Sequence, residues 1–135
     1  MSFTNYLESA LLDEVFGGVN YTPPATLYIG LSSTAPAEGG TGITEPTAAS
    51  YARVAVTNNL TNWPATGTDG TKSNGTAITF PQAAEDWGPN ITHFFIADAA
   101  TAGNILASGS LSVAKTIGVA DTASFGAGSL TITLD

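Results

Sequence analysis

The sequence predicts an all-β fold: an antiparallel, jelly-roll-like sandwich of seven to eight short strands with one N-terminal helix. Short segments rich in β-branched and aromatic residues recur along the chain, and turns rich in Gly, Pro and Asn separate them. No helical pattern lies between these segments, which favours antiparallel sheets over a parallel α/β fold. The segments expected to form strands are 25–31, 51–57, 76–80, 91–97, 104–111, 113–119 and 129–134.

The helix is expected in residues 1–18, with residues 19–135 forming the β-sandwich body. Asn5 followed three residues later by Glu8 resembles a capping box, and Gly17-Gly18 is a strong stop signal. A helix of about a dozen residues is marginal by itself in water, so it should lie against the body or a partner. Its apolar stripe at helical spacing consists of Leu7, Leu11 and Val15, with Leu12 and Phe16 alongside.

The last strand and two long loops add further expectations. Leu130, Ile132 and Leu134 should face the core, because alternate residues of a strand share one face. Residues 32–50 and 58–75 form loops that are long for so small a domain. Loops of this length are usually functional or ordered by a partner.

The composition excludes several classes of function. Hydrophobic residues make up 43% of the 135 residues, enough for a core. Charged residues make up 10%, against roughly 25% in an ordinary soluble domain, so covering the surface strips few ions of water. A net charge of −8 would repel nucleic acid and an anionic membrane surface. We therefore expect neither as a partner; the chain also has no cysteine for disulfides or thiolate metal sites.

The only histidine, His93, is the first candidate for chemistry. A general base needs a partner group, and a zinc site needs further ligands. The carboxylates are scattered, and the adjacent Glu85 and Asp86 would point to opposite faces of a strand. We therefore expect His93 to be a sheet residue, and we expect no catalytic residue, no metal and no cofactor.

Packing and surface residues carry more information. Trp63 and Trp87 lie in turn sequences, where a tryptophan is either a lid over the sandwich or an interface anchor. Both interpretations stay open for Trp63, whereas a lid is favoured for Trp87. Arg53, the sole arginine, should pair with a carboxylate inside the fold or across a subunit boundary. The candidate interface residues are Tyr6, Leu7, Leu11, Val15, Phe16, Trp63 and Arg53.

The order of the segments NYLESALLDEVFGG, PATLYIGLSST, YARVAV, SNGTAITFPQAAEDWG, THFFIADAATAGNILASGSL and GAGSLTITLD resembles a family of small tailed-bacteriophage virion proteins. Members are commonly named tail fibre proteins, and some are similar to capsid cement or decoration proteins. The resemblance covers nearly the whole chain. It implies an all-β, jelly-roll-like structural subunit present in many copies per particle, with no catalytic residues to transfer.

Within that family the sequence favours a capsid cement protein, because a compact domain without repeats or heptads is unlike a fibre shaft. The expected partners are the major capsid protein and further copies of the chain, as a dimer or trimer. The expected location is the capsid surface of the virion, after synthesis in the bacterial cytoplasm. Two alternatives stay open: a tail fibre or baseplate component that attaches to the host, and a lectin-like domain that stacks a sugar on Trp63 or Trp87.

Overall fold

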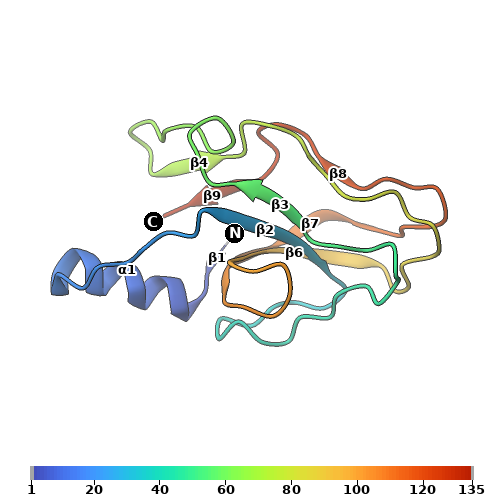
Figure 1. The fold of residues 1–135 in the computed structure, drawn as a ribbon, viewed down its shortest axis with the longest axis horizontal. Helices are drawn as coiled ribbons and strands as arrows, with labels where there is room; N and C mark the ends of the chain where they lie inside the picture. The colour runs from blue at the N-terminus through green and yellow to red at the C-terminus, as the bar shows by residue number, and fades with distance from the viewer. Residues whose placement is uncertain (1, 135) are drawn as a thin grey trace.

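The computed structural model describes residues 2–134, which form nine strands and one helix (Figure 1). The helix is α1 (Asn5–Gly17). The strands are β1 (Ser2–Phe3), β2 (Thr26–Ser32), β3 (Val54–Thr57), β4 (Thr71–Ser73), β5 (Ile78–Thr79), β6 (Ile91–Ala97), β7 (Ile105–Lys115), β8 (Ser124–Phe125) and β9 (Thr131–Thr133).

One antiparallel sheet dominates the fold, with strand order β1-β7-β6-β2-β3. Two small antiparallel sheets, β4-β9 and β5-β8, lie over one face of it (Figure 1). The arrangement is sandwich-like and mostly β, as the sequence predicts.

The main core fills the space between the large sheet and the small ones. Ile29 and Phe94 of the large sheet pack in one cluster with Ile78 of β5 and Leu130 beside β9. Every one of these side chains is buried. Burial of this apolar surface is the main stabilisation of the fold.

A second, smaller core lies on the opposite face of the large sheet, where Phe95, Ala97 and Ile105 cluster. Ile43, from the long loop between β2 and β3, packs against it. The hydroxyl of Ser32 holds this loop by accepting a hydrogen bond from the backbone N–H of Thr44 at 3.0 Å. The loop is therefore ordered by its own chain and covers a core.

Several strand predictions need correction. The segments 104–111 and 113–119 form the single strand β7, which ends at Lys115. The two-residue strands β1 and β8 and the three-residue strand β4 were not predicted, since so few residues show no alternation. Leu130 is buried as expected, but Leu134 is exposed at the end of the chain.

The second half of β7 departs from regular pairing. Ile91 lies opposite Lys115 and His93 lies opposite Ser110, so residues 111–114 face Thr92 alone. A bulge of this kind bends the strand away from its neighbour. It explains why the sequence around Ser112 reads as the end of one strand and the start of another.

The helix has the predicted length but a different N-terminal cap. Thr4 is the cap residue, and its hydroxyl donates to the carbonyl of Ile105 instead of capping the helix. The capping box at Asn5 was therefore a wrong prediction. The stop is confirmed: Gly18 is left-handed, with φ of 67°, and its N–H donates to the carbonyl of Asp13. At 13 residues α1 is too short to cross a bilayer, and residues 2–134 hold no helix long and apolar enough to do so.

Candidate functional site

The outer half of α1 projects beyond the β-body, at the left of Figure 1. Leu7, Ala10 and Leu11 are half-buried on the side of the helix that faces the body. Beyond them every residue of the helix is exposed, and no helix residue is fully buried. The predicted apolar stripe is therefore divided: Leu7 and Leu11 pack on the body, whereas Val15 is exposed.

The exposed part carries an apolar patch. We call Leu12, Val15, Phe16 and Val19 the helix tip; all four are exposed, and Phe16 is 83% exposed. Within the helix the spacing of Leu12, Val15 and Phe16 places them on one face. Tyr6, nearer the base of the helix, is also exposed. Of the candidate interface residues, Tyr6, Val15 and Phe16 are therefore available for contacts, whereas Leu7 and Leu11 are partly used inside the chain.

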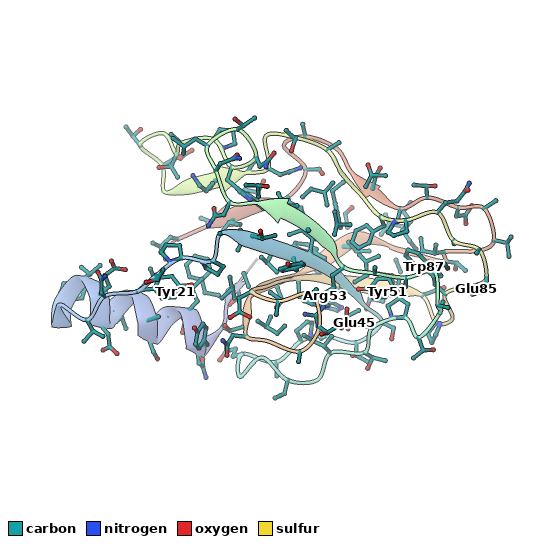
Figure 2. All side chains as sticks on the ribbon, viewed as in Figure 1. Tyr21, Glu45, Tyr51, Arg53, Glu85 and Trp87 are labelled. Carbon is teal, nitrogen blue, oxygen red and sulfur yellow. The ribbon has the colours of Figure 1, made fainter. Side chains whose placement is uncertain are left out.

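The helix is acidic and contains no basic residue in its last turn. Its charged side chains are Glu8, Asp13 and Glu14, all exposed. Tyr21 lies in the segment that returns from Gly18 to β2 (Figure 2). Burial of its side chain raises the pKa of Tyr21, and the nearby Tyr6, Asp98 and Glu14 raise it further.

An apolar groove opens at the base of the helix, and we call it the end groove. It has a volume of about 390 Å³ and lies between the start of α1, the large sheet and the β4-β9 sheet. Its lining residues are Phe3, Leu7, Leu27, Thr66, Gly70, Lys72, Ile96, Leu106, Ala107, Ile132 and Leu134. Lys72 is the one charged residue among them, and its ammonium group donates to the carbonyl of Pro64 at 2.8 Å.

Arg53 forms an internal ion pair and is not a surface contact. Its guanidinium group donates to both carboxylate oxygens of Glu45, at 3.0 and 2.8 Å, and its side chain is only 6% exposed. The same group donates to the carbonyls of Ala99 and Ala102 and lies 4.9 Å from the ring centroid of Phe95. The prediction of a carboxylate partner inside the fold is confirmed (Figure 2).

Tyr51 extends this cluster into the core. Its hydroxyl donates to Glu45 at 2.7 Å and accepts from the backbone N–H of Leu31 at 3.0 Å. Burial raises the pKa of Tyr51 well above its ordinary value, and the hydrogen bond to Glu45 raises it further. The phenol therefore acts as a fixed hydrogen-bonding group of the fold and stays protonated.

Both tryptophans are core residues, each 2% exposed. Trp87 stacks edge-on against Tyr51 and donates its indole N–H to the hydroxyl of Ser50 at 3.0 Å. The lid interpretation of Trp87 is thus confirmed, and the interface interpretation of Trp63 was wrong for this chain. A sugar platform needs an exposed ring face, so neither tryptophan can provide the one expected for a lectin-like domain.

Ser50 also holds Glu85 in place. The backbone N–H and the hydroxyl of Ser50 donate to Glu85 Oε1 at 2.8 and 3.0 Å. These two hydrogen bonds lower the pKa of Glu85, because they favour the charged carboxylate. Glu85 thus fastens the turn before β3 to the segment that carries Trp87 (Figure 2).

His93 is a sheet residue, as predicted. It pairs with Ser32 on one side and Ser110 on the other, and its Nδ1 lies 2.8 Å from the hydroxyl of Thr92. A histidine base needs a nucleophile within reach and an orienting group on its other nitrogen. Within residues 2–134 no group of three His, Asp or Glu side chains is placed to hold a metal ion.

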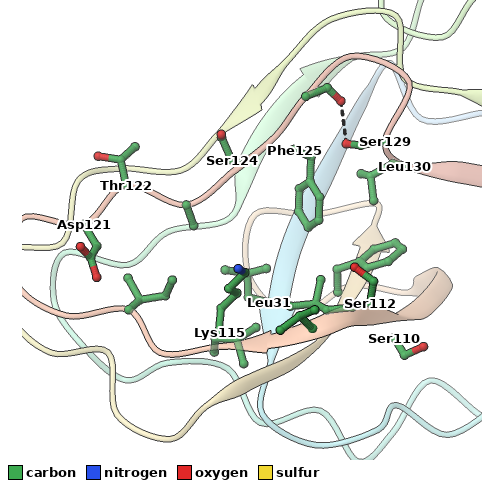
Figure 3. Close-up of a pocket in the computed structure, with 17 residues that line it drawn as sticks. Leu31, Ser110, Ser112, Lys115, Asp121, Thr122, Ser124, Phe125, Ser129 and Leu130 are labelled. Carbon is green, nitrogen blue, oxygen red and sulfur yellow. Dashed lines mark hydrogen bonds between the residues drawn. The ribbon is translucent and has the colours of Figure 1, made fainter.

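A large cavity, of about 680 Å³, lies between the bulged half of β7 and β8 (Figure 3). Hydroxyl groups are frequent in its wall, at Ser110, Ser112, Thr122, Ser124 and Ser129. Ser129 donates to the carbonyl of Gly126 at 2.6 Å. His93, the cross-strand partner of Ser110, is not among the lining residues, and its Nδ1 lies at hydrogen-bonding distance from Thr92, which is not a lining residue either.

Sequence reasoning missed the end groove, because its walls come from segments far apart in the chain. It identified Leu12, Val15 and Phe16 of the helix tip but not Val19, and it placed them in one apolar stripe with Leu7 and Leu11. The exposure of Leu12 and Phe16 follows from where the helix leaves the body, which periodicity does not encode.

Comparison with known proteins identifies the family. Residues 2–133 match the family model described as podophage GP4 fiber I protein gp80. The search of curated proteins found no match. The matched residues span nearly the whole fold, including α1 and both small sheets. This chain therefore belongs to the podophage GP4 fiber I protein gp80 family, and it is a bacteriophage virion protein.

Proposed function

We propose that the chain is a structural subunit of a phage fibre that works through protein contacts and carries out no reaction. The observation that carries this proposal is the helix tip, an apolar patch on an element that projects from the body. Exposed apolar clusters on a soluble domain mark contact sites for other molecules. The family description, which names a fiber protein, supports the same function.

The internal use of the polar groups also supports this proposal. Arg53 and Tyr51 both donate hydrogen bonds to Glu45, and Ser50 donates to Glu85. Groups that act on a substrate must meet in a cleft with free hydrogen-bonding capacity. In this chain the polar side chains instead hold loops against the large sheet.

Capsid cement is the second candidate function, with the major capsid protein as partner. The low charge density favours it, since 10% charged residues leave a surface that loses little on being covered. Modest contacts of such a subunit would add up over the many sites of a capsid. On this alternative the protein lies on the head and not on the fibre.

Immunogold electron microscopy of purified particles tests the location. Antibody against this chain should label the fibres and leave the head unlabelled. Label spread over the whole head would overturn the fibre proposal and support the cement function. A mutant lacking the chain should lose its fibres yet keep heads that resist heating and osmotic shock as well as wild type.

Substitution of the helix tip tests the contact surface more cleanly than deletion of residues 1–18. Such a deletion removes β1 and the buried Thr4, which donates to the carbonyl of Leu106 through its N–H at 2.9 Å. A variant with Leu12, Val15 and Phe16 all replaced by Ser should fold but fail to enter particles. Incorporation at the wild-type level would contradict the assignment of the tip as an assembly surface.

A further inference from the structure

The two layers of the sandwich meet at one edge and stay apart at the other. At the closed edge β3 of the large sheet contacts β5 of the small sheet β5-β8. At the opposite edge β7 and β8 are not paired with each other, and the cavity of about 680 Å³ lies between them (Figure 3). We call it the edge cavity, because it fills this open edge of the sandwich.

The outer half of β7 is an unpaired strand edge. β1 pairs with β7 only at Ala107 and Ser108, and no other strand within residues 2–134 lies along that side of β7. Thr4 donates its backbone N–H to the carbonyl of Leu106. Backbone groups of successive strand residues point alternately to the two sides, so those of Ser110 point toward this unpaired edge.

β8 presents a second unpaired edge across the edge cavity. One of its two pairs with β5 joins Ser124 to Thr79. At the next position along the pair, Phe80 donates its N–H to the carbonyl of Ala123 at 2.9 Å, which makes that pair the hydrogen-bonded one. In an antiparallel ladder the neighbouring pair then has no hydrogen bonds. The backbone N–H and carbonyl of Ser124 therefore point away from β5.

The lining shows that the edge cavity follows both strand edges. Consecutive residues line it, 110–113 in β7 and 121–126 around β8. The side chains of a strand alternate between two faces, so a surface over one face would be lined by every second residue. An unbroken run of lining residues indicates that the main chain is also reached. The volume lies within the range of about 300–1,000 Å³ that is typical of ligand pockets.

The chemistry of the edge cavity favours an extended peptide. Its floor is apolar, with the buried side chains of Leu31, Phe94 and Leu130. Lys115 and Asp121 line opposite walls, so the charges inside it balance. An extended peptide matches these surfaces, because it offers N–H and carbonyl groups to strand edges and apolar side chains to the floor. A sugar or a lipid chain has no such row of backbone groups. The net charge of −8 further favours a peptide with basic residues at its ends.

We propose that the edge cavity receives an extended segment of a different virion protein. The segment lies as an additional strand along β7 beyond β1, and its apolar side chains cover Leu31 and Phe94. Addition of a strand to an exposed sheet edge is a common mode of peptide recognition. This contact is separate from the helix tip and independent of the part of the particle that holds the chain. Its tests can therefore fail while immunogold labelling still places the protein on fibres.

A pair of substitutions at Ser110 tests the main-chain contact. Ser110→Pro removes the outward N–H, whereas Ser110→Ala keeps it and removes only the hydroxyl; proline is tolerated where a strand N–H faces an open edge. With both variants shown to be folded by circular dichroism, Ser110→Pro should lower the amount of chain per particle at least threefold and Ser110→Ala should stay near wild type. Wild-type incorporation of Ser110→Pro would overturn the proposal. Equal loss in both variants would also overturn it, because a ligand that binds the hydroxyl, such as a sugar, would then be present.

Hydrogen exchange of the wild-type chain tests the same contact without a substitution. Backbone amides in residues 110–113 and at Ser124 should exchange at least tenfold more slowly in purified particles than in the isolated chain. Residues 64–70, an exposed loop outside the edge cavity, control for general burial in the particle. Unchanged exchange at residues 110–113, or equal slowing in the control loop, would contradict the added strand.

Photo-cross-linking in particles tests the identity of the partner. A benzophenone amino acid in place of Ser112, which lines the edge cavity, should cross-link to one segment of a different virion protein, identified by mass spectrometry. That segment should show alternating apolar residues. The same probe in place of Val119, which is 68% exposed and does not line the cavity, should not give this product. A cross-link from Ser112 to a second copy of this chain or to a non-protein component would overturn the proposal.

Discussion

The cluster around Arg53 and the tip of α1 both contain residues that the sequence marks as candidate contacts, but their surroundings are opposite. Arg53 has a carboxylate, two backbone carbonyls and an aromatic ring as neighbours, all from its own chain. Phe16 is 83% exposed. The arginine of this protein, in which few residues are charged, is therefore used inside the fold, whereas large apolar residues of the helix tip are exposed.

A large loss of stability is expected when the Arg53 cluster is broken. Arg53→Met would leave Glu45 without its cation and the carbonyls of Ala99 and Ala102 without their donor. Breaking one side of a buried ion pair costs roughly 3 kcal/mol or more of the free energy of unfolding. Urea denaturation should show this loss, and Lys115→Met, at an exposed lysine, should stay close to wild type.

The contact between β2 and β6 should give the next largest effect. Gly30 lies opposite Phe95, and a Cβ atom at Gly30 would come within 2.1 Å of the ring. Gly30→Ala would force the ring out of its place, and overpacking of this kind costs typically about 1–3 kcal/mol.

The control for this prediction is Gly39→Ala, because a Cβ atom at Gly39 meets open space and its φ is not in the left-handed region. Thermal unfolding of the two variants should separate them clearly. Equal melting temperatures would mean that Phe95 moves aside at no cost and that the second core is loosely packed.

A smaller effect is expected in the pH dependence of stability, at Glu85. Its pKa in the folded chain lies below the ordinary value of 4.5, because of the hydrogen bonds from Ser50. The carboxylate therefore stabilises the fold above pH 4.5, and this contribution is lost as the pH falls through the lower pKa of the folded state.

Urea midpoints of wild type and Glu85→Gln should differ at neutral pH and converge as the pH falls below 4.5. Glu38→Gln, at an exposed carboxylate, controls for the change in net charge. A constant difference between wild type and Glu85→Gln at every pH would show that the carboxylate charge is not what Ser50 recognises.

The sequence predicted the longer elements, because a helix or strand of several residues shows a recognisable pattern. The bounds of β6 and the stop of α1 at Gly17-Gly18 agree with the sequence, since a seven-residue segment rich in β-branched and aromatic residues and a pair of glycines are strong signals. The two residues of β1 carry no such signal. They pair with β7 because Thr4 is anchored to Ile105 and Leu106, which is a tertiary effect.

The candidate site was only partly predictable for the same reason. Trp63 and Trp87 stand in turn sequences of similar composition, and both are buried because distant segments cover them. The end groove combines residues from six strands, including β1 and β9 near the two ends of the chain. Periodicity could place Phe16 on the apolar side of a helix. The length of helix that projects from the body, however, depends on the whole fold.

The smallest expected effect on stability completes the comparison. Phe16→Ser should change the free energy of unfolding by no more than about 0.5 kcal/mol, because the side chain is exposed and the two residues have similar helix propensities. Phe95→Ala, at a fully buried phenylalanine, should cost about 3–5 kcal/mol. Both should be measured at a protein concentration low enough for the chain to be monomeric, because association adds to the apparent stability.

A large loss of stability in monomeric Phe16→Ser would mean that the tip packs on its own body in solution. The tip could then not serve as an assembly surface. A negligible loss, together with failure of the variant to enter particles, would separate the two roles of α1. In that case the half-buried side of the helix, with Leu7 and Leu11, holds it on the body, and the side with Phe16 acts only in contacts with other proteins.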